Sequence, residues 1–241
     1  MDYIIDLQGY ICPESGFLPK EIAIVLLMRH SASSWVIAPP HHYHTYEPSV
    51  KKCIDFYSCK VHGIRWAEGS VDGDELCREI KNIMLSANNI YTYVDSRSKV
   101  EFLEWTLGRN VINLCNYLCP SSSDLSREFG FKSTCIHHML KSETKIHCEY
   151  QCALNNSRLY KKWILKLARD YTDSPDAPDS ETISQALARY LRENAQGDDI
   201  TSEASAVDNE NDDNDGEYNI GVNNIYSQNA SPPAYDSLFR Q

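Results

Sequence analysis

The sequence has no long hydrophobic segment. Its longest apolar run, residues 22–28, is far shorter than the roughly 20 residues that a helix needs to cross a bilayer, so we expect no membrane span. The first ten residues, MDYIIDLQGY, carry no basic residue and soon meet Asp6, so they do not resemble a secretion signal. These two absences predict an intracellular protein, in the cytoplasm or the nucleus.

The cysteine pattern also argues against a secreted protein. The chain has nine cysteines, all between Cys12 and Cys152. An odd number without a secretion signal is atypical of a disulfide framework. Free thiols or a zinc site are therefore the expected uses of cysteine.

An excess of basic residues is missing as well. The chain has 23 Lys and Arg against 34 Asp and Glu, for a net charge of -11. Residues 171–241 hold three of the basic and fifteen of the acidic residues, which leaves 20 and 19 for residues 1–170. The protein is thus a nearly neutral body with an acidic tail, and its total charge shows no strongly basic nucleic-acid-binding face.

The apolar pattern of the body predicts an α/β fold. Residues 3–7, 20–29 and 34–38 are short apolar runs separated by turn residues, as in an antiparallel meander. Helical spacing then marks residues 74–87, 99–107, 125–129 and 152–168, with strands at 90–94 and 111–114 between them. The segment after His41 shows no clear period. We expect a mixed sheet flanked by helices over residues 1–170.

The composition changes in residues 171–241. A Pro, Asp and Ser linker precedes one short amphipathic helix at about 181–194, with Thr182 and Gln185 as a capping box. From Gly197 to about Gly221 the chain is rich in Asp, Asn and Glu. Such a segment buries too little apolar surface to offset its conformational entropy, so a disordered acidic tail is expected.

The order of elements in the body resembles the DEDDh-type 3′–5′ exonucleases, which have a ribonuclease H-like fold. Residues 4–9 (IIDLQG) are similar to the first-strand motif of that family, an Asp-x-Glu pair. Residues 62–105 resemble its middle stretch, and residues 152–167 its last motif, a His and an Asp before a long helix. The resemblance implies a site in which four carboxylates hold two divalent metal ions and a histidine acts as general base.

Most of the carboxylates that this resemblance implies are replaced. Asp6 matches the first acid, but Gln8 stands at the second, and Lys99 at the third if Phe102 and Leu103 match the Phe-Leu pair of the family. In the last motif, one register puts Gln151 at the histidine and Asn156 at the final acid; a register starting at His147 puts Cys152 there instead. Asp95 and Glu101 are alternative middle acids. Magnesium needs charged oxygen ligands, so we expect no efficient nuclease activity.

A second candidate site is rich in soft ligands. Cys135-x-His137-His138 is followed by His147-Cys148-x3-Cys152. Cys135, His137 (or His138), His147 and Cys152 could hold zinc tetrahedrally, although the spacing is not that of a standard finger. The alternative is that these cysteines pack as small apolar residues.

A short motif ends the tail. Pro232-Pro233-Ala234-Tyr235 is a PPxY segment, which matches the aromatic groove of WW domains. Tyr235 and Leu238 also form an overlapping Y-x-x-Φ motif. Similar tails in viral and arrestin-like proteins recruit WW-containing ligases, so by analogy a viral or virus-derived origin is a hypothesis.

Three functions remain open from the sequence. The first is a non-catalytic adaptor whose exonuclease-like body binds a protein or a nucleic-acid end and whose tail recruits a WW-domain partner. The second is an active, magnesium-dependent 3′–5′ exonuclease with a rearranged site. The third is a scaffold stabilised by zinc.

Overall fold

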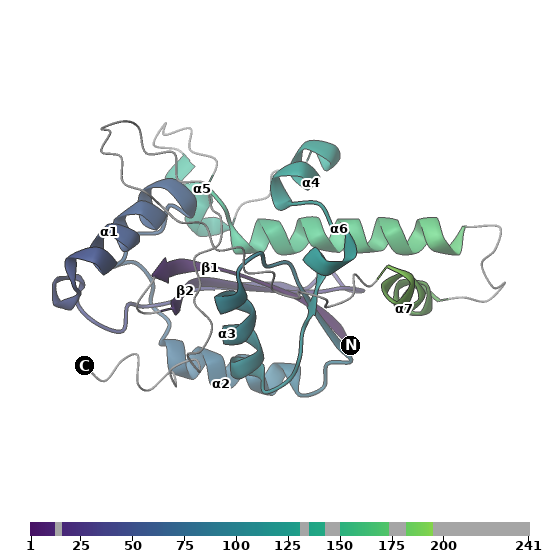
Figure 1. Ribbon diagram of the computed structural model, residues 1–241, viewed down its shortest axis with the longest axis horizontal. Helices are drawn as coiled ribbons and strands as arrows, with labels where there is room; N and C mark the ends of the chain where they lie inside the picture. Colours follow the sequence, from purple (N-terminus) through teal and green to yellow (C-terminus); the bar gives the residue numbers. More distant parts are fainter. Residues whose placement is uncertain (13–15, 131–134, 143–149, 174–181, 195–241) are drawn as a thin grey trace, which may run out of the picture.

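A computed structural model describes residues 1–12, 16–130, 135–142, 150–173 and 182–194. The described chain forms a mixed five-stranded sheet, in the order β3-β2-β1-β4-β5, with helices on both faces (Figure 1). The predicted α/β fold class is therefore confirmed. None of the described helices combines the length and the apolar character that crossing a membrane requires.

The sheet joins an antiparallel meander to two parallel strands. β1 (Asp2–Cys12) pairs antiparallel with β2 (Gly16–Leu26), which pairs with β3 (Ala32–Val36). On its other side β1 runs parallel to β4 (Asn89–Thr92), and β4 runs parallel to β5 (Ile112–Asn113). The predicted meander is correct, and β1 lies at the centre of the sheet.

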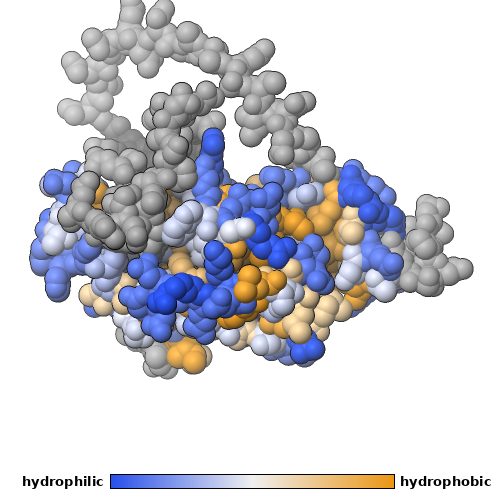
Figure 2. All heavy atoms as spheres, turned by 90° about the horizontal axis from the view of Figure 1, so that it is seen from below, coloured by the Kyte–Doolittle hydropathy of each residue, from blue (hydrophilic) through white to orange (hydrophobic). Residues whose placement is uncertain are grey.

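Helices cover the two faces of the sheet with separate cores. Helices α2 (Gly73–Met84) and α3 (Arg97–Leu107) pack on one face, while α4 (Ser122–Phe129) and α6 (Ala153–Thr172) pack on the other (Figure 1). The Asp72 side chain caps α2 by accepting a hydrogen bond from the Glu75 NH, and α3 ends at Gly108 in a left-handed conformation. Seen from the side of α2 and α3, apolar areas interrupt a mainly polar surface (Figure 2).

Alternation along the central strand decides which side chains reach α6. Tyr3, Ile5 and Leu7 join the core under α2 and α3, while Ile4 joins the core under α6. Because neighbouring strand residues point to opposite faces, Asp6 and Gln8 project toward α6 with Ile4. On β2 the same rule places Glu21 on the α6 face with Ala23 and Val25.

Sequence periodicity did not predict two of the helices. The structure adds α1 (Pro48–Phe56) and α5 (Ile136–Ser142). The expected tail helix is α7 (Ile183–Glu193), with the predicted Thr182–Gln185 capping box. Leu187 and Tyr190 of α7 pack into the same core as Trp163 of α6, so the folded body extends past residue 170. Residues 195–241 lie outside the described part of the chain.

Candidate metal centre

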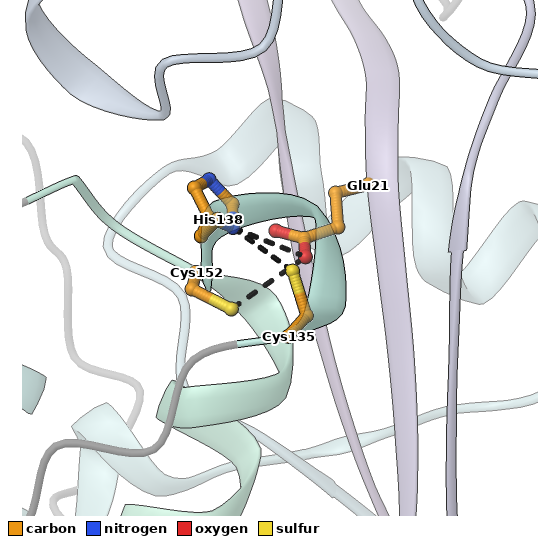
Figure 3. A group of neighbouring side chains, drawn as sticks. All are labelled: Glu21, Cys135, His138 and Cys152. Atoms are coloured by element: carbon orange, nitrogen blue, oxygen red, sulfur yellow. Dashed lines mark hydrogen bonds and ion pairs between the residues drawn. The ribbon is translucent and has the colours of Figure 1, made fainter. Parts of the chain in front are cut away.

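Four buried side chains from three separate segments converge between β2 and the start of α6. They are Glu21 on β2, Cys135 just before α5, His138 on α5 and Cys152 at the N-cap of α6 (Figure 3). One ligand atom from each lies within 4.8 Å of all the others. The described part of the chain contains no other group of three or more His, Cys, Asp or Glu residues arranged in this way.

Glu21 connects the sheet to the first turn of α6. Its Oε2 atom accepts a hydrogen bond of 2.8 Å from the backbone NH of Ala153, one of the NH groups that a helix leaves without an internal partner. Its Oε1 atom lies 3.6 Å from the Cys152 Sγ atom and 3.9 Å from the His138 Nδ1 atom. Burial raises the pKa of this carboxyl group to about 8. Its charged form therefore needs a partner, such as a cation, at this position.

A backbone carbonyl group orients the His138 ring through the Nε2 atom. The Nε2 atom lies 2.6 Å from the carbonyl oxygen of His62, and since a carbonyl only accepts, Nε2 carries the hydrogen. The Nδ1 atom is left facing the Cys135 Sγ atom at 3.0 Å. A backbone carbonyl that fixes the tautomer of a histidine ligand is a common second contact in metal sites.

The pKa values of the two thiols are shifted in opposite directions. A hydrogen bond with Cys135 lowers the pKa of the Cys152 thiol; burial acts in the opposite direction, and a hydrogen bond with His138 lowers this pKa further. The pKa of the Cys135 thiol is raised by the same hydrogen bond with Cys152 and by burial. Cys152 also lies at the N-terminus of a 20-residue helix, where the peptide dipoles favour a negative charge. Thiolate is the form of cysteine that binds metal.

The ligand types and their spacing show that the group could bind a metal ion, and they are compatible with zinc. Zinc–sulfur and zinc–nitrogen bonds of about 2.3 and 2.0 Å imply tetrahedral edges of about 3.3–3.8 Å. Three of the observed separations are 3.0, 3.6 and 3.9 Å, and all four ligand atoms lie within 4.8 Å of one another, so small side-chain adjustments would bring them around one ion. Two thiols and an imidazole favour zinc over magnesium, and four buried protein ligands leave no coordination position for substrate. The group could thus hold a metal ion in a closed, structural site.

Asp6, Gln8 and Asn156, which the sequence resemblance singles out, form a second polar group next to the first. Asp6 Oδ2 accepts hydrogen bonds from Gln8 Nε2 at 3.2 Å and from Asn156 Nδ2 of α6 at 3.0 Å. Burial raises the pKa of Asp6 to about 7, although the ammonium group of Lys99 and both amides act in the opposite direction. Two of the predicted positions, Gln8 and Asn156, therefore contact the Asp6 carboxyl group, although Asn156 lies 150 residues from Asp6 in the sequence.

The other nuclease candidates lie elsewhere. Gln151 is exposed, and its backbone NH donates to the Val61 carbonyl. Asp95 is exposed, and Glu101 is paired with Arg97 at 2.7 Å. Among the described residues, no group of three or more potential metal ligands includes Asp6.

The two polar groups share one face of the sheet. Gln8 is the register partner of Glu21 across β1 and β2, and neighbouring side chains of such a pair lie about 5 Å apart. Helix α6 covers both, with Cys152 over Glu21 and Asn156 one turn later over Asp6. The metal group thus adjoins the polar group of Asp6, Gln8 and Asn156 on the same face of the sheet.

The predicted zinc ligands are partly corrected. Cys135 and Cys152 do meet, but the histidine is His138; the His137 Nε2 atom instead lies 3.2 Å from Glu68. His147 lies outside the described residues, as do Pro232, Pro233, Tyr235 and Leu238 of the tail. Glu21 was missed, although a charged residue inside an apolar strand is itself a signal, because a buried charge requires a partner.

Comparison with known proteins gives no match to a family model and no match to a curated protein. Fold and site together define an α/β protein with a mixed sheet, a buried polar group around Asp6 and a candidate metal centre.

Proposed function

We propose that this chain is a non-catalytic, exonuclease-like binding module. The observation that carries the proposal is the environment of Asp6, whose carboxyl group is held by the amides of Gln8 and Asn156. A two-metal nuclease site needs several carboxylates around the ions. Here the side chains that contact the Asp6 carboxyl group are neutral amides, and the charge of Lys99 acts on it from a greater distance.

The charges near Asp6 support the proposal, because they disfavour a divalent metal ion at this carboxyl group. Two magnesium ions bring four positive charges, which oxygen ligands with negative charge must balance. Asp6 supplies at most one negative charge, and with a pKa of about 7 it is only partly ionised near neutral pH. Lys99 adds a positive charge that repels a metal ion.

A rearranged active site at the metal group is also disfavoured. Its ligands include two sulfur atoms, whereas magnesium prefers oxygen. All four residues are buried, so a nucleic-acid phosphate has no open position on the ion. This group is better suited to stabilising the fold than to hydrolysis.

A nuclease assay tests the proposal. The full-length protein should release no nucleotides from single-stranded DNA or RNA above the background of the preparation, with either magnesium or manganese. Asp6→Ala should leave this background unchanged. The exposed Asp95→Ala serves as the matched control. Turnover that Asp6→Ala abolishes and Asp95→Ala retains would show that Asp6 belongs to a working active site.

Zinc is the proposed occupant of Glu21, Cys135, His138 and Cys152. Its role would be to fasten α5 and the start of α6 to β2, which is far from both of them in the sequence. The support is the match of soft ligand types, compact spacing and full burial. Zinc would thereby stabilise the body that presents the binding surface.

The tail supplies the proposed adaptor function. Pro232, Pro233 and Tyr235 would occupy the groove of a WW domain, while the body binds a protein or a nucleic-acid end.

A pull-down with an isolated WW domain should capture the full-length protein. Tyr235→Ala should reduce capture at least about tenfold, a loss of about 1.4 kcal/mol of binding energy. Tyr226→Ala, outside the motif, is the control. Equal capture of wild type and Tyr235→Ala would remove the motif from the proposal.

A further inference from the structure

A second pair of cysteines lies apart from the metal group. Cys12 is at the end of β1, and Cys53 is on α1, the helix at one end of the sheet (Figure 1). Their sulfur atoms are 2.8 Å apart, although the residues are separated by 41 positions in the sequence. This distance is well inside the contact distance of two sulfur atoms that merely pack.

The surroundings give the two thiols different roles. Cys12 is buried in a core formed with Tyr10, Val50 and Ile54, whereas Cys53 is only partly buried at its edge. The Cys12 thiol donates a hydrogen bond to Cys53 Sγ, and the Cys53 thiol lies 3.1 Å from the Ile11 carbonyl oxygen, to which it donates. The bond from Cys12 lowers the pKa of the Cys53 thiol. Cys53 is therefore the more accessible and the more readily ionised of the two.

We propose that Cys12 and Cys53 form a reversible dithiol–disulfide pair that locks α1 onto β1 in response to a low-molecular-weight disulfide such as oxidised glutathione. A disulfide has a sulfur–sulfur bond of about 2.05 Å, so closure requires the sulfur atoms to approach by less than about 1 Å. The proposal is independent of the nuclease and zinc proposals.

The reaction proceeds by two exchanges. The Cys53 thiolate attacks one sulfur of oxidised glutathione, forming a mixed disulfide and releasing one glutathione thiolate. Cys12 then loses its proton and attacks the Cys53 sulfur, releasing the second glutathione. The protein thiols lose two protons and two electrons, and one oxidised glutathione becomes two reduced molecules. Excess thiol reverses both steps.

The bond would change the stability of one end of the molecule. It would close a long loop, and cross-linking of this kind lowers the entropy of the unfolded chain. The cross-link joins α1 to the core that contains Tyr10 and Trp66. The oxidised protein should therefore melt several degrees above the reduced protein.

The experiment maps thiols in the full-length protein. After incubation with oxidised glutathione, free thiols are alkylated and the peptides are identified by mass spectrometry. The expected product is a peptide linking Cys12 to Cys53, lost on addition of excess dithiothreitol. In Cys12→Ser, Cys53 should instead remain as a mixed disulfide with glutathione. Cys77→Ser, which removes a half-buried thiol on α2, should leave the cross-link unchanged.

Three results in the wild-type protein would overturn the proposal. None of them requires a substitution, so misfolding of a variant cannot explain them. The first is that Cys53 accumulates as the glutathione adduct while Cys12 stays free. The second is that Cys53 links to the exposed Cys59 in preference to Cys12. The third is that both thiols remain free at a glutathione ratio that modifies Cys59.

Discussion

Cys152→Ala and His138→Ala should each release zinc and lower the free energy of unfolding by more than about 5 kcal/mol. The reason is that a structural zinc ion contributes its binding energy to folding, and this energy reaches about 10–16 kcal/mol in small domains. Each change also leaves the other three ligands buried without a common partner. The wild-type protein should carry about one zinc per chain by native mass spectrometry. A chelator should lower its Tm and should have little effect on either variant.

His137→Ala is the matched control for the metal centre. His137 is adjacent to His138 in the sequence but contacts Glu68, so its removal should leave the zinc content and the effect of the chelator unchanged. Loss of zinc in His137→Ala with retention in His138→Ala would contradict the geometry. A wild-type protein without zinc, whose Tm a chelator does not change, would show that the four side chains only pack together.

Regular periodicity explains which elements could be predicted. Helix α2 buries Leu76, Ile80 and Met84 at helical spacing, and its sequence indicates a helix directly. Helix α1 buries only Val50 and Ile54, a stripe too short to stand out from the surrounding polar residues. The α7 helix and its capping box could be predicted because they are local features. Its packing against Trp163 could not, since an apolar face does not specify its partner.

The candidate metal centre could be predicted only in part, for a similar reason. Cys135 and Cys152 are visible as soft ligands, but choosing between His137 and His138 requires knowing that a helix starts at Ile136. Helical geometry brings residues three apart to one face, which selects His138 as the neighbour of Cys135. Glu21 lies more than a hundred residues from the other ligands, and only the packing of α6 on β2 brings it to them.

The Asp6 group was more accessible to sequence reasoning. Strand alternation alone places Asp6 and Gln8 on one face. The motif resemblance then identifies Asn156, and the structure places its amide on Asp6. Gln151 does not follow, because it precedes α6, in a segment whose backbone pairs with Val61 rather than with β1. Motif spacing therefore leads to a residue in contact with Asp6 at the helical position, Asn156, and to one away from Asp6 at the loop position, Gln151.

Asp6→Asn should stabilise the protein at pH 8 by up to about 4 kcal/mol, which corresponds to a pKa raised from 3.8 to about 7. Between these two values the folded protein binds a proton that the unfolded chain does not. The contribution of Asp6 to stability is therefore fully present below about pH 4 and is lost as the pH rises through 7. The asparagine side chain of the variant does not titrate, and its carbonyl oxygen can accept the same hydrogen bonds from Gln8 and Asn156.

Urea unfolding of both proteins from pH 4 to pH 9, in excess zinc, measures this effect as the difference between two curves. The difference should grow in favour of Asp6→Asn as the pH rises, while the exposed Asp95→Asn should follow the wild type. A lower stability of Asp6→Asn at pH 8 would mean that the ionised carboxylate is stabilised after all. If magnesium or manganese then stabilises the wild type but not Asp6→Asn, Asp6 binds metal, and the proposal of a non-catalytic module is wrong.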